Sequence, residues 1–250
     1  SAAQLFFFSN WLAMTSTEEI PSSKEDTNDD EVDMDNYREE IERLVRRHRN
    51  EKHAPEVLPF DQDVVETMSE LLHFVDKSLK EDRASGEQGP THPSWYFRST
   101  ETERLTYLLS DYLRIRLRKL FKYPQYYLDL ERQSFLSSSE RVALREYWDL
   151  KSAYLENRLL CGLPESWRKL DQVDDLRDMI RSPCLQSHIY ARIHADLGQL
   201  QITPSTKLGS QGSTQDTRLT LDAGETYLIR YEVVRQFLVE PEHDGKVQLV

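Results

Sequence analysis

The chain has 250 residues, of which 38% are hydrophobic and 30% charged, a composition typical of a soluble protein with one large domain or two modest ones. No apolar run approaches the ~20 residues needed to cross a bilayer, which argues against a membrane-spanning protein. The formal net charge is −12, but residues 15–42 hold twelve acidic and two basic residues and so carry −10 of it. The rest of the chain is close to neutral.

Residues 1–34 are expected to form a disordered acidic tail, because residues 15–34 contain too few apolar side chains to offset the entropy of ordering. The opening stretch SAAQLFFFSNWLA lacks the basic start of a signal peptide, and Ser9 and Asn10 interrupt its apolar run. We therefore expect residues 1–13 to take no part in the fold.

An α-helical domain is predicted over residues 35–170. Its first helix begins near Asp35 and ends at HAPEVLPF, where two prolines break it. Asp61 opens a second helix whose apolar residues recur with a period near 3.6. A third helix is predicted from about Tyr96 to Phe121, stopped by Pro124. Two more elements follow in QYYLDLERQ and SSSERVALREYWDLKSAYLENRLLCGLP, and the serines at the start of the last one supply its N-cap.

A linker over residues 171–183 and a small β-rich domain over residues 184–250 are predicted next, which makes the fold class α+β. Five short runs rich in β-branched and aromatic residues indicate strands: SHIYARIHA, GQLQIT, TRLTLD, TYLIRYEVV and KVQLV. The polar insert at residues 204–216 is expected to be a flexible hairpin loop. The last strand is expected to pair with TYLIRYEVV, which offers matching apolar side chains.

The motifs of common enzyme classes are absent from the sequence. There is no phosphate-binding glycine loop followed by Lys-Ser/Thr, no HExxH zinc motif and no Gly-x-Ser-x-Gly elbow. Cys161 and Cys184 lie far apart without a CxxC pattern, which indicates reduced, buried thiols in an intracellular protein. The sequence therefore argues against an enzyme and against a bound metal or cofactor.

The third helix, YLLSDYLRIRLRKLFKYPQYYLDL, combines an apolar face with many cations. Eight apolar residues from Leu105 to Phe121 share one broad face, and burying each stabilises by roughly 1.5–3 kcal/mol, against about 0–1 kcal/mol for an exposed ion pair. Arg114, Arg118 and Lys122 form an adjoining cationic row. This row is a solvated face, a subunit interface or a phosphate-binding surface; we expect it to pair with a buried carboxylate.

Two stretches are similar to one known family. ERLTYLLSDYLRIRLRKLFKYPQYYL resembles the signature helix of the GINS family, in the subunit type called Sld-five, and YLIRYEVVRQFLVEPEHDGKVQLV resembles its last β-hairpin-like unit. NEKHAPEVLP, after the first helix, agrees as well. The resemblance runs from about Tyr37 to Val250 and departs from the family in the acidic tail and the 204–216 insert.

The resemblance implies a non-catalytic scaffold of the nucleus. It implies one of four related subunits in a heterotetramer that joins the minichromosome maintenance (MCM) ring and a Cdc partner in the replicative helicase, for initiation and elongation of DNA replication. In relatives, the N-terminal segment of this subunit docks on a trimeric replisome hub. No membrane contact is implied, and any contact with DNA would be indirect or weak.

The candidate partner-interface residues come from the cationic helix and the C-terminal strands: Arg104, Tyr112, Arg114, Ile115, Arg116, Arg118, Tyr227, Leu228, Ile229, Arg230, Tyr231, Val247, Leu249 and Val250. The candidate docking residues of the tail are Val32, Met34 and Tyr37.

A nucleic-acid-binding module is the alternative function. It would use the basic helix and an OB-like β-domain in which aromatic residues alternate with basic residues. Tyr190, Arg192, Tyr227, Arg230 and Tyr231 would supply them.

Overall fold

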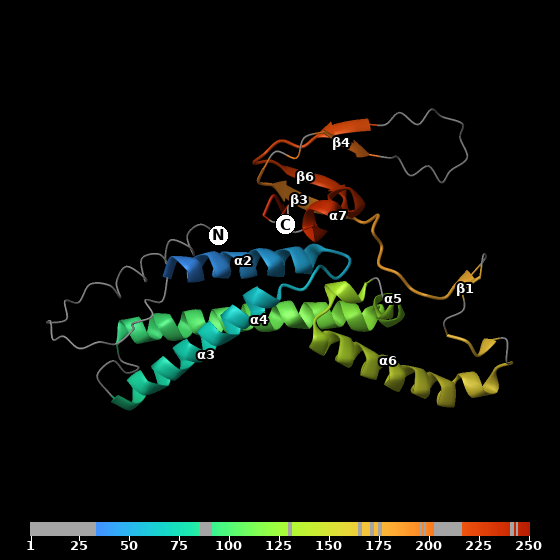
Figure 1. Ribbon diagram of the computed structural model, residues 1–250, viewed down its shortest axis with the longest axis horizontal. Helices are drawn as coiled ribbons and strands as arrows, with labels where there is room; N and C mark the ends of the chain where they lie inside the picture. The colour runs from blue at the N-terminus through green and yellow to red at the C-terminus, as the bar shows by residue number, and fades with distance from the viewer. Residues whose placement is uncertain are drawn as a thin grey trace. The chain divides into compact units, whose positions relative to one another are not determined.

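The computed structural model of the protein describes residues 34–85, 92–129, 132–164, 167–170, 173–174, 177–195, 197, 199–202, 217–240, 243 and 245–250. The tail residue Val32, nearly all of the expected disordered tail and the 204–216 insert lie outside the described residues. Residues 43–250 form one compact unit, which holds both helical and β-rich parts. The predicted α+β class is confirmed (Figure 1).

The first two helices meet at a proline-containing connector. Helix α2 (Met34–His53) begins one residue before the expected cap, and α3 (Gln62–Ser85) begins directly after Asp61. The Val64 amide lies 3.5 Å from Asp61 Oδ1, as expected for an acidic residue at a helix start. Residues 54–61 between the two helices are called the connector below.

Helix α4 (Pro93–Lys122) begins earlier than expected. The His92 side chain caps it by accepting a hydrogen bond from the Ser94 amide, and the proline occupies the first turn, where no amide donor is needed. Helix α4 packs along α3 and ends before Pro124, which opens the short α5 (Pro124–Leu128) (Figure 1).

Helix α6 (Ser138–Arg158) begins with the predicted serine cap. The Ser137 hydroxyl accepts from the Glu140 amide at 3.1 Å, and the Glu140 carboxylate accepts from the Ser137 amide at 3.0 Å. Short 3₁₀ turns, Gln133–Phe135 before the helix and Leu160–Gly162 after it, flank α6. The core of the helical part joins this helix to α4, α5 and the connector through Val57, Leu120, Tyr127, Leu136 and Leu144.

The β-rich part contains a three-stranded antiparallel sheet in the order β6-β3-β7. Its strands are β3 (His188–Ile193), β6 (Thr226–Arg230) and β7 (Val247–Leu249). A separate hairpin pairs β4 (Gln199–Ile202) with β5 (Thr217–Thr220), and β1 (Val173–Asp174) pairs with β2 (Arg177–Asp178). Helix α7 (Tyr231–Val239) follows β6 and packs on the sheet (Figure 1).

One buried cluster fills the space between the sheet and α7. It contains the inward side chains of β3, β6 and β7 together with Tyr231, Val234 and Phe237 of α7. Ala54 and Leu58 of the connector belong to the same cluster, whereas Val57 belongs to the helical core. The connector therefore contributes apolar side chains to both cores.

The structure corrects two predictions about the C-terminal region. TYLIRYEVV is half strand and half helix, because α7 begins at Tyr231, so the last unit is not a simple hairpin. Strand β7 pairs with β3 and not with this segment; Ala191 is the register partner of Leu249. Both edge strands of the sheet, β6 and β7, thus pair with the central strand β3.

The expected burial of the thiols is also wrong, since Cys161 and Cys184 are exposed.

Deletion of residues 246–250 is expected to unfold the β-rich part while the helices stay folded. The deletion removes Val247 and Leu249, which are buried and stabilise by roughly 1.5–3 kcal/mol each. It also removes the hydrogen bond from the Leu249 amide to Asn50 Oδ1 (2.8 Å). Limited proteolysis should show cleavage after Pro183; an unchanged digestion pattern would contradict the role assigned to β7.

Candidate subunit interface

A buried guanidinium lies at the centre of the helical part. Arg116 of α4 is fully buried and uses all five of its N–H donors. It forms two hydrogen bonds with the Glu140 carboxylate, at 2.7 and 3.0 Å, and one with Glu51 at 3.2 Å. The remaining contacts reach the carbonyl oxygens of Leu58 (2.7 Å) and Phe135 (3.0 Å). One side chain therefore links α2, the connector, the 3₁₀ turn and α6.

The charge on Arg116 persists in this buried position because acidic groups surround it. Burial disfavours the charged form, but the Glu51 and Glu140 carboxylates outweigh burial and raise the pKa of Arg116 above its usual range. Burial also raises the pKa of the neighbouring Tyr112 to about 12, so this phenol stays neutral. Arg116 is consequently a permanent cation.

Lys119 extends the same network into the connector. Its Nζ donates to Glu51 Oε1 (2.8 Å), to the Glu56 carbonyl (2.8 Å) and to the Glu51 carbonyl. Burial lowers the pKa of Lys119, although Glu51 opposes this shift. The Glu51 carboxylate also accepts from the Leu58 amide at 3.2 Å. The connector has no regular structure of its own, and these side chains satisfy its buried backbone groups.

A second carboxylate joins the helical part to the β-rich part. Glu56 is 2% exposed and accepts hydrogen bonds from Tyr231 Oη at 2.8 Å and from Arg235 at 2.6 and 3.1 Å. Burial raises the pKa of Tyr231, and the hydrogen bond to Glu56 raises that of Arg235. Asn50 adds a bond to the Leu249 amide. The two parts are thus held together by polar contacts as well as by the shared apolar cluster.

The structure places the fourteen candidate interface residues in three groups. Six are buried inside the chain and are unavailable to a partner: Tyr112, Arg116, Ile229, Tyr231, Val247 and Leu249. Four are partly buried: Arg104, Ile115, Tyr227 and Arg230. Four are exposed: Arg114, Arg118, Leu228 and Val250. The prediction that these six residues contact a partner is therefore corrected, since their side chains are buried inside the chain itself.

The expected buried carboxylate partner does not belong to the cationic row. Arg114 lies 3.7 Å from Asp111 on the same helix, and its side chain is 60% exposed. The buried acids Glu51 and Glu140 pair instead with Arg116, which lies on the inward face of α4. Among the described residues of this chain, replacing Arg114 and Arg118 would therefore leave no buried acid unpaired.

Helix α6 exposes apolar side chains that the sequence reasoning missed. Leu150 and Tyr154 lie one turn apart on one side of the helix and are 73% and 63% exposed, and Val142 is exposed near its start. Leu144 is buried and Tyr147 stacks on Phe121, with 4.3 Å between the ring centroids, so the first half of the helix packs on the rest of the helical part. The four-residue spacing of Leu150 and Tyr154 could have indicated this exposed pair, which we call the α6 face.

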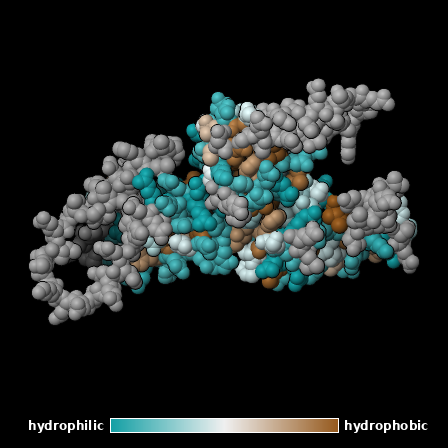
Figure 2. Space-filling model, turned by 45° about the horizontal axis from the view of Figure 1, so that its top comes forward, coloured by the Kyte–Doolittle hydropathy of each residue, from teal (hydrophilic) through white to brown (hydrophobic). Residues whose placement is uncertain are grey.

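Exposed aromatic residues also occur at the other end of the helical part. Phe74 of α3 and Tyr96, Phe97 and Tyr107 of α4 are all exposed. Figure 2 shows brown apolar surface mainly in the middle of the view, with teal polar surface on both sides. Large exposed apolar patches are typical of protein-binding surfaces.

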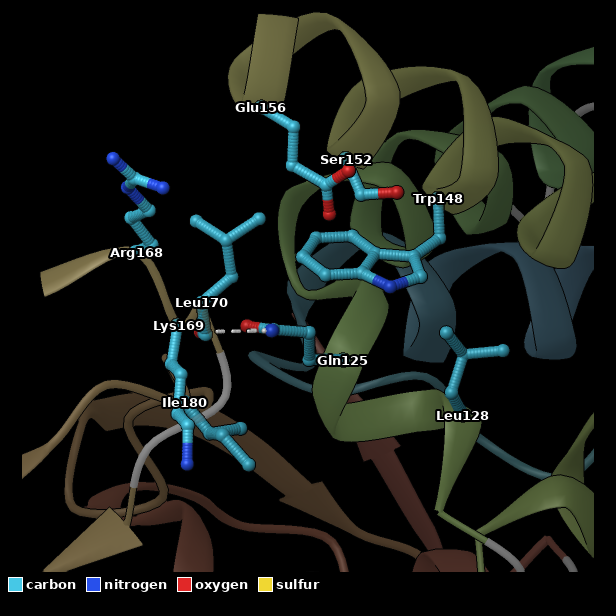
Figure 3. A pocket seen from close by; sticks show the side chains of 9 residues that line it. All are labelled: Gln125, Leu128, Trp148, Ser152, Glu156, Arg168, Lys169, Leu170 and Ile180. Carbon is cyan, nitrogen blue, oxygen red and sulfur yellow. Dashed lines mark hydrogen bonds between the residues drawn. The ribbon is translucent and has the colours of Figure 1, made fainter. Parts of the chain in front are cut away.

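An open groove of about 530 Å³ lies beside α6. Trp148, Ser152 and Glu156 of α6 line one side of it, and Gln125 of α5 donates a 3.0 Å hydrogen bond to the Leu170 carbonyl across it (Figure 3). The groove marks where the chain after α6 returns to α5. None of the candidate site residues lines it.

The described part of the chain has neither a metal-binding cluster nor a membrane-spanning helix. No cluster of three or more His, Cys, Asp or Glu side chains there could hold a metal ion. No described helix is long and apolar enough to span a membrane.

Comparison with known proteins gives two family matches. Residues 74–159 match the family described as "GINS complex protein helical bundle domain", and residues 183–250 match "DNA replication complex GINS protein SLD5 C-terminus". The first covers the region from α3 to α6, and the second covers the β-rich part with α7.

Curated relatives agree with these matches. The chain is 28% identical to the rat (Rattus norvegicus) "DNA replication complex GINS protein SLD5" over 95% of this chain and 100% of the relative. It is 29% identical to the human protein of that name over 84% and 88%. The fission yeast (Schizosaccharomyces pombe) protein is 24% identical over 80% and 88%.

Proposed function

Because this chain belongs to the SLD5 family of GINS proteins, which act in DNA replication, we propose that it is a non-catalytic structural subunit of a nuclear GINS heterotetramer. The α6 face is the observation that carries this proposal. It consists of exposed apolar side chains that do not belong to the chain's own described cores, and it lies within the matched helical-bundle region.

The proposed binding partners of the chain are the three other GINS subunits. The resemblance extends it to the replicative helicase, in which the tetramer joins the MCM ring and a Cdc partner for initiation and elongation. The exposed candidates Arg114, Arg118, Leu228 and Val250 remain proposed contact residues, together with the partly buried Arg104, Ile115, Tyr227 and Arg230. The protein's contribution is to present rigid surfaces, because its two parts are fixed to each other through Glu56 and the shared cluster.

Leu150→Asp combined with Tyr154→Asp is expected to reduce co-purification with the other GINS subunits by roughly tenfold or more, since losing an interface hot spot costs about 2 kcal/mol or more. Both side chains are exposed in the isolated chain, so its folding should stay unchanged. Asn157→Asp, which adds one negative charge at an exposed position on α6, is the control.

Quantitative co-purification from cells that express all four subunits is the measurement. A double variant that assembles as well as the Asn157→Asp control would show that the α6 face is not a subunit contact.

The N-terminal tail is proposed to dock on a trimeric replisome hub. Tyr37 lies on α2 and is partly buried, whereas Val32 and the side chain of Met34 lie outside the described residues. A short acidic segment with a few apolar side chains suits binding that is coupled to folding.

A peptide of residues 15–44 is expected to bind the hub protein and to lose most of its affinity when Val32, Met34 and Tyr37 are replaced by alanine. The same peptide with Asn28→Ala is the control. Titration of the labelled peptide measures both, and equal affinities, or no binding at all, would contradict the docking proposal.

A further inference from the structure

The solvent-facing side of the three-stranded sheet carries an apolar row across all three strands. Tyr190 of β3 is the register partner of Leu228 of β6, and the Val250 amide donates to the Tyr190 carbonyl at 3.0 Å. The three side chains are 55–57% exposed. We call them the apolar rung. The solvated face of an antiparallel sheet normally carries polar side chains, so this rung is a departure from the usual pattern.

Basic and polar groups lie on both sides of the apolar rung. His188 pairs in register with Arg230 on one side, and Arg192 pairs with Thr226 and Gln248 on the other. Among the described strand positions that share this face, no side chain is acidic. The surface therefore combines an apolar centre with positively charged flanks, although the chain as a whole carries −12.

We propose that this face binds an acidic segment of a partner protein, anchored by apolar side chains on Tyr190, Leu228 and Val250 and flanked by carboxylates that meet Arg192 and Arg230. Strands are about 4.8 Å apart, so a rung across three strands is about 10 Å wide and accommodates two or three side chains of a short segment. The site is separate from the α6 face, so the chain can contact two partners at once.

The composition of the face favours protein over nucleic acid. A surface that binds single-stranded nucleic acid needs several exposed aromatic rings with basic residues between them. Tyr231 is buried against Glu56, and the Tyr227 hydroxyl is held by Glu225 at 2.8 Å, at the end of β6. Only Tyr190 of these three tyrosines is exposed on this face, and aliphatic side chains occupy the positions beside it. Aliphatic anchors suit an apolar peptide side chain better than a base.

Fluorescence anisotropy with the full chain and a labelled twelve-residue peptide tests the proposal. The peptide consists of Asp and Glu around a central Leu-Phe pair; one comparison peptide has Ala-Ala at the centre and another has Lys in place of each acid. The Leu-Phe acidic peptide is expected to bind at least tenfold more tightly than either. Tyr190→Ala with Leu228→Ala, and separately Arg192→Glu, should each weaken binding at least tenfold.

The controls are exposed residues of the same types elsewhere. Met179→Ala and Arg145→Glu should leave the affinity within twofold of the unsubstituted chain. Thermal unfolding of every variant checks that the β-rich part remains folded. Equal binding of the three peptides, or no effect of the rung variants, would overturn the proposal. Tight binding of an oligothymidylate that the rung variants abolish, without peptide binding, would assign the face to nucleic acid instead.

Discussion

Arg116→Ala is expected to destabilise the protein by about 3–5 kcal/mol, because it leaves the buried Glu140 carboxylate without its cation and Glu51 with Lys119 alone. Glu51 and Glu140 are 1% and 6% exposed, so water cannot replace the lost guanidinium fully. The connector carbonyl of Leu58 also loses its donor. A domain has about 5–15 kcal/mol of stability in total, so the variant should lose a large share of its free energy of unfolding. The urea midpoint of the full chain measures the effect.

Arg118→Ala is the matched control for this experiment, since Arg118 lies on the same helix and is exposed. It should change the free energy of unfolding by less than about 0.5 kcal/mol. Arg116→Lys should also destabilise, because an ammonium cannot form the two parallel hydrogen bonds with Glu140. Equal urea midpoints for the Arg116→Ala and Arg118→Ala variants would contradict the central role of Arg116.

Glu56→Ala is expected to release the β-rich part from the helical part. The substitution removes three hydrogen bonds, from Tyr231 and Arg235, and leaves the buried Tyr231 hydroxyl without an acceptor. Bonds to charged groups contribute about 1.5–3 kcal/mol, so the cost should fall in or above that range. The shared cluster around Ala54 and Leu58 and the hydrogen bond from the Leu249 amide to Asn50 then hold the two parts together. Faster protease cleavage in residues 171–183 should report the release.

The control for Glu56→Ala is Glu240→Ala, because Glu240 is an exposed acid that follows α7. Its contact with His243, at 3.5 Å, is largely solvent-exposed and should contribute little. Cleavage of the Glu56→Ala variant at the same rate as the control would show that the two parts stay fixed without the Glu56 contacts.

Local signals in the sequence predicted the helices well. The prolines of the connector, Pro124 and the Ser137 cap each act on the backbone within a few residues, so their effect can be read without knowing the tertiary structure. Strand pairing could not be predicted in the same way. β7 pairs with β3, more than fifty residues away, and only the packed sheet decides between β3 and β6.

The inward position of Arg116 shows a second limit of sequence reasoning. The buried residues Leu105, Leu109, Tyr112, Arg116 and Leu120 are spaced by three and four, so Arg116 follows the apolar periodicity. From the sequence alone, an arginine inside an apolar row cannot be distinguished from one at the edge of the apolar face, because its long side chain can reach water from either position. The sequence did not show that Arg116 has a buried acidic partner, because Glu51 lies on another helix, sixty-five residues earlier.

The most direct test of the scaffold account is the mass of the assembly that the chain forms with the other GINS subunits. The full chain and the three other subunits are expressed together, purified through a tag on this chain and weighed by native mass spectrometry. The account predicts a single 1:1:1:1 complex in which the partner subunits cover the α6 face. A well-folded monomer that leaves the other three subunits unbound would contradict it.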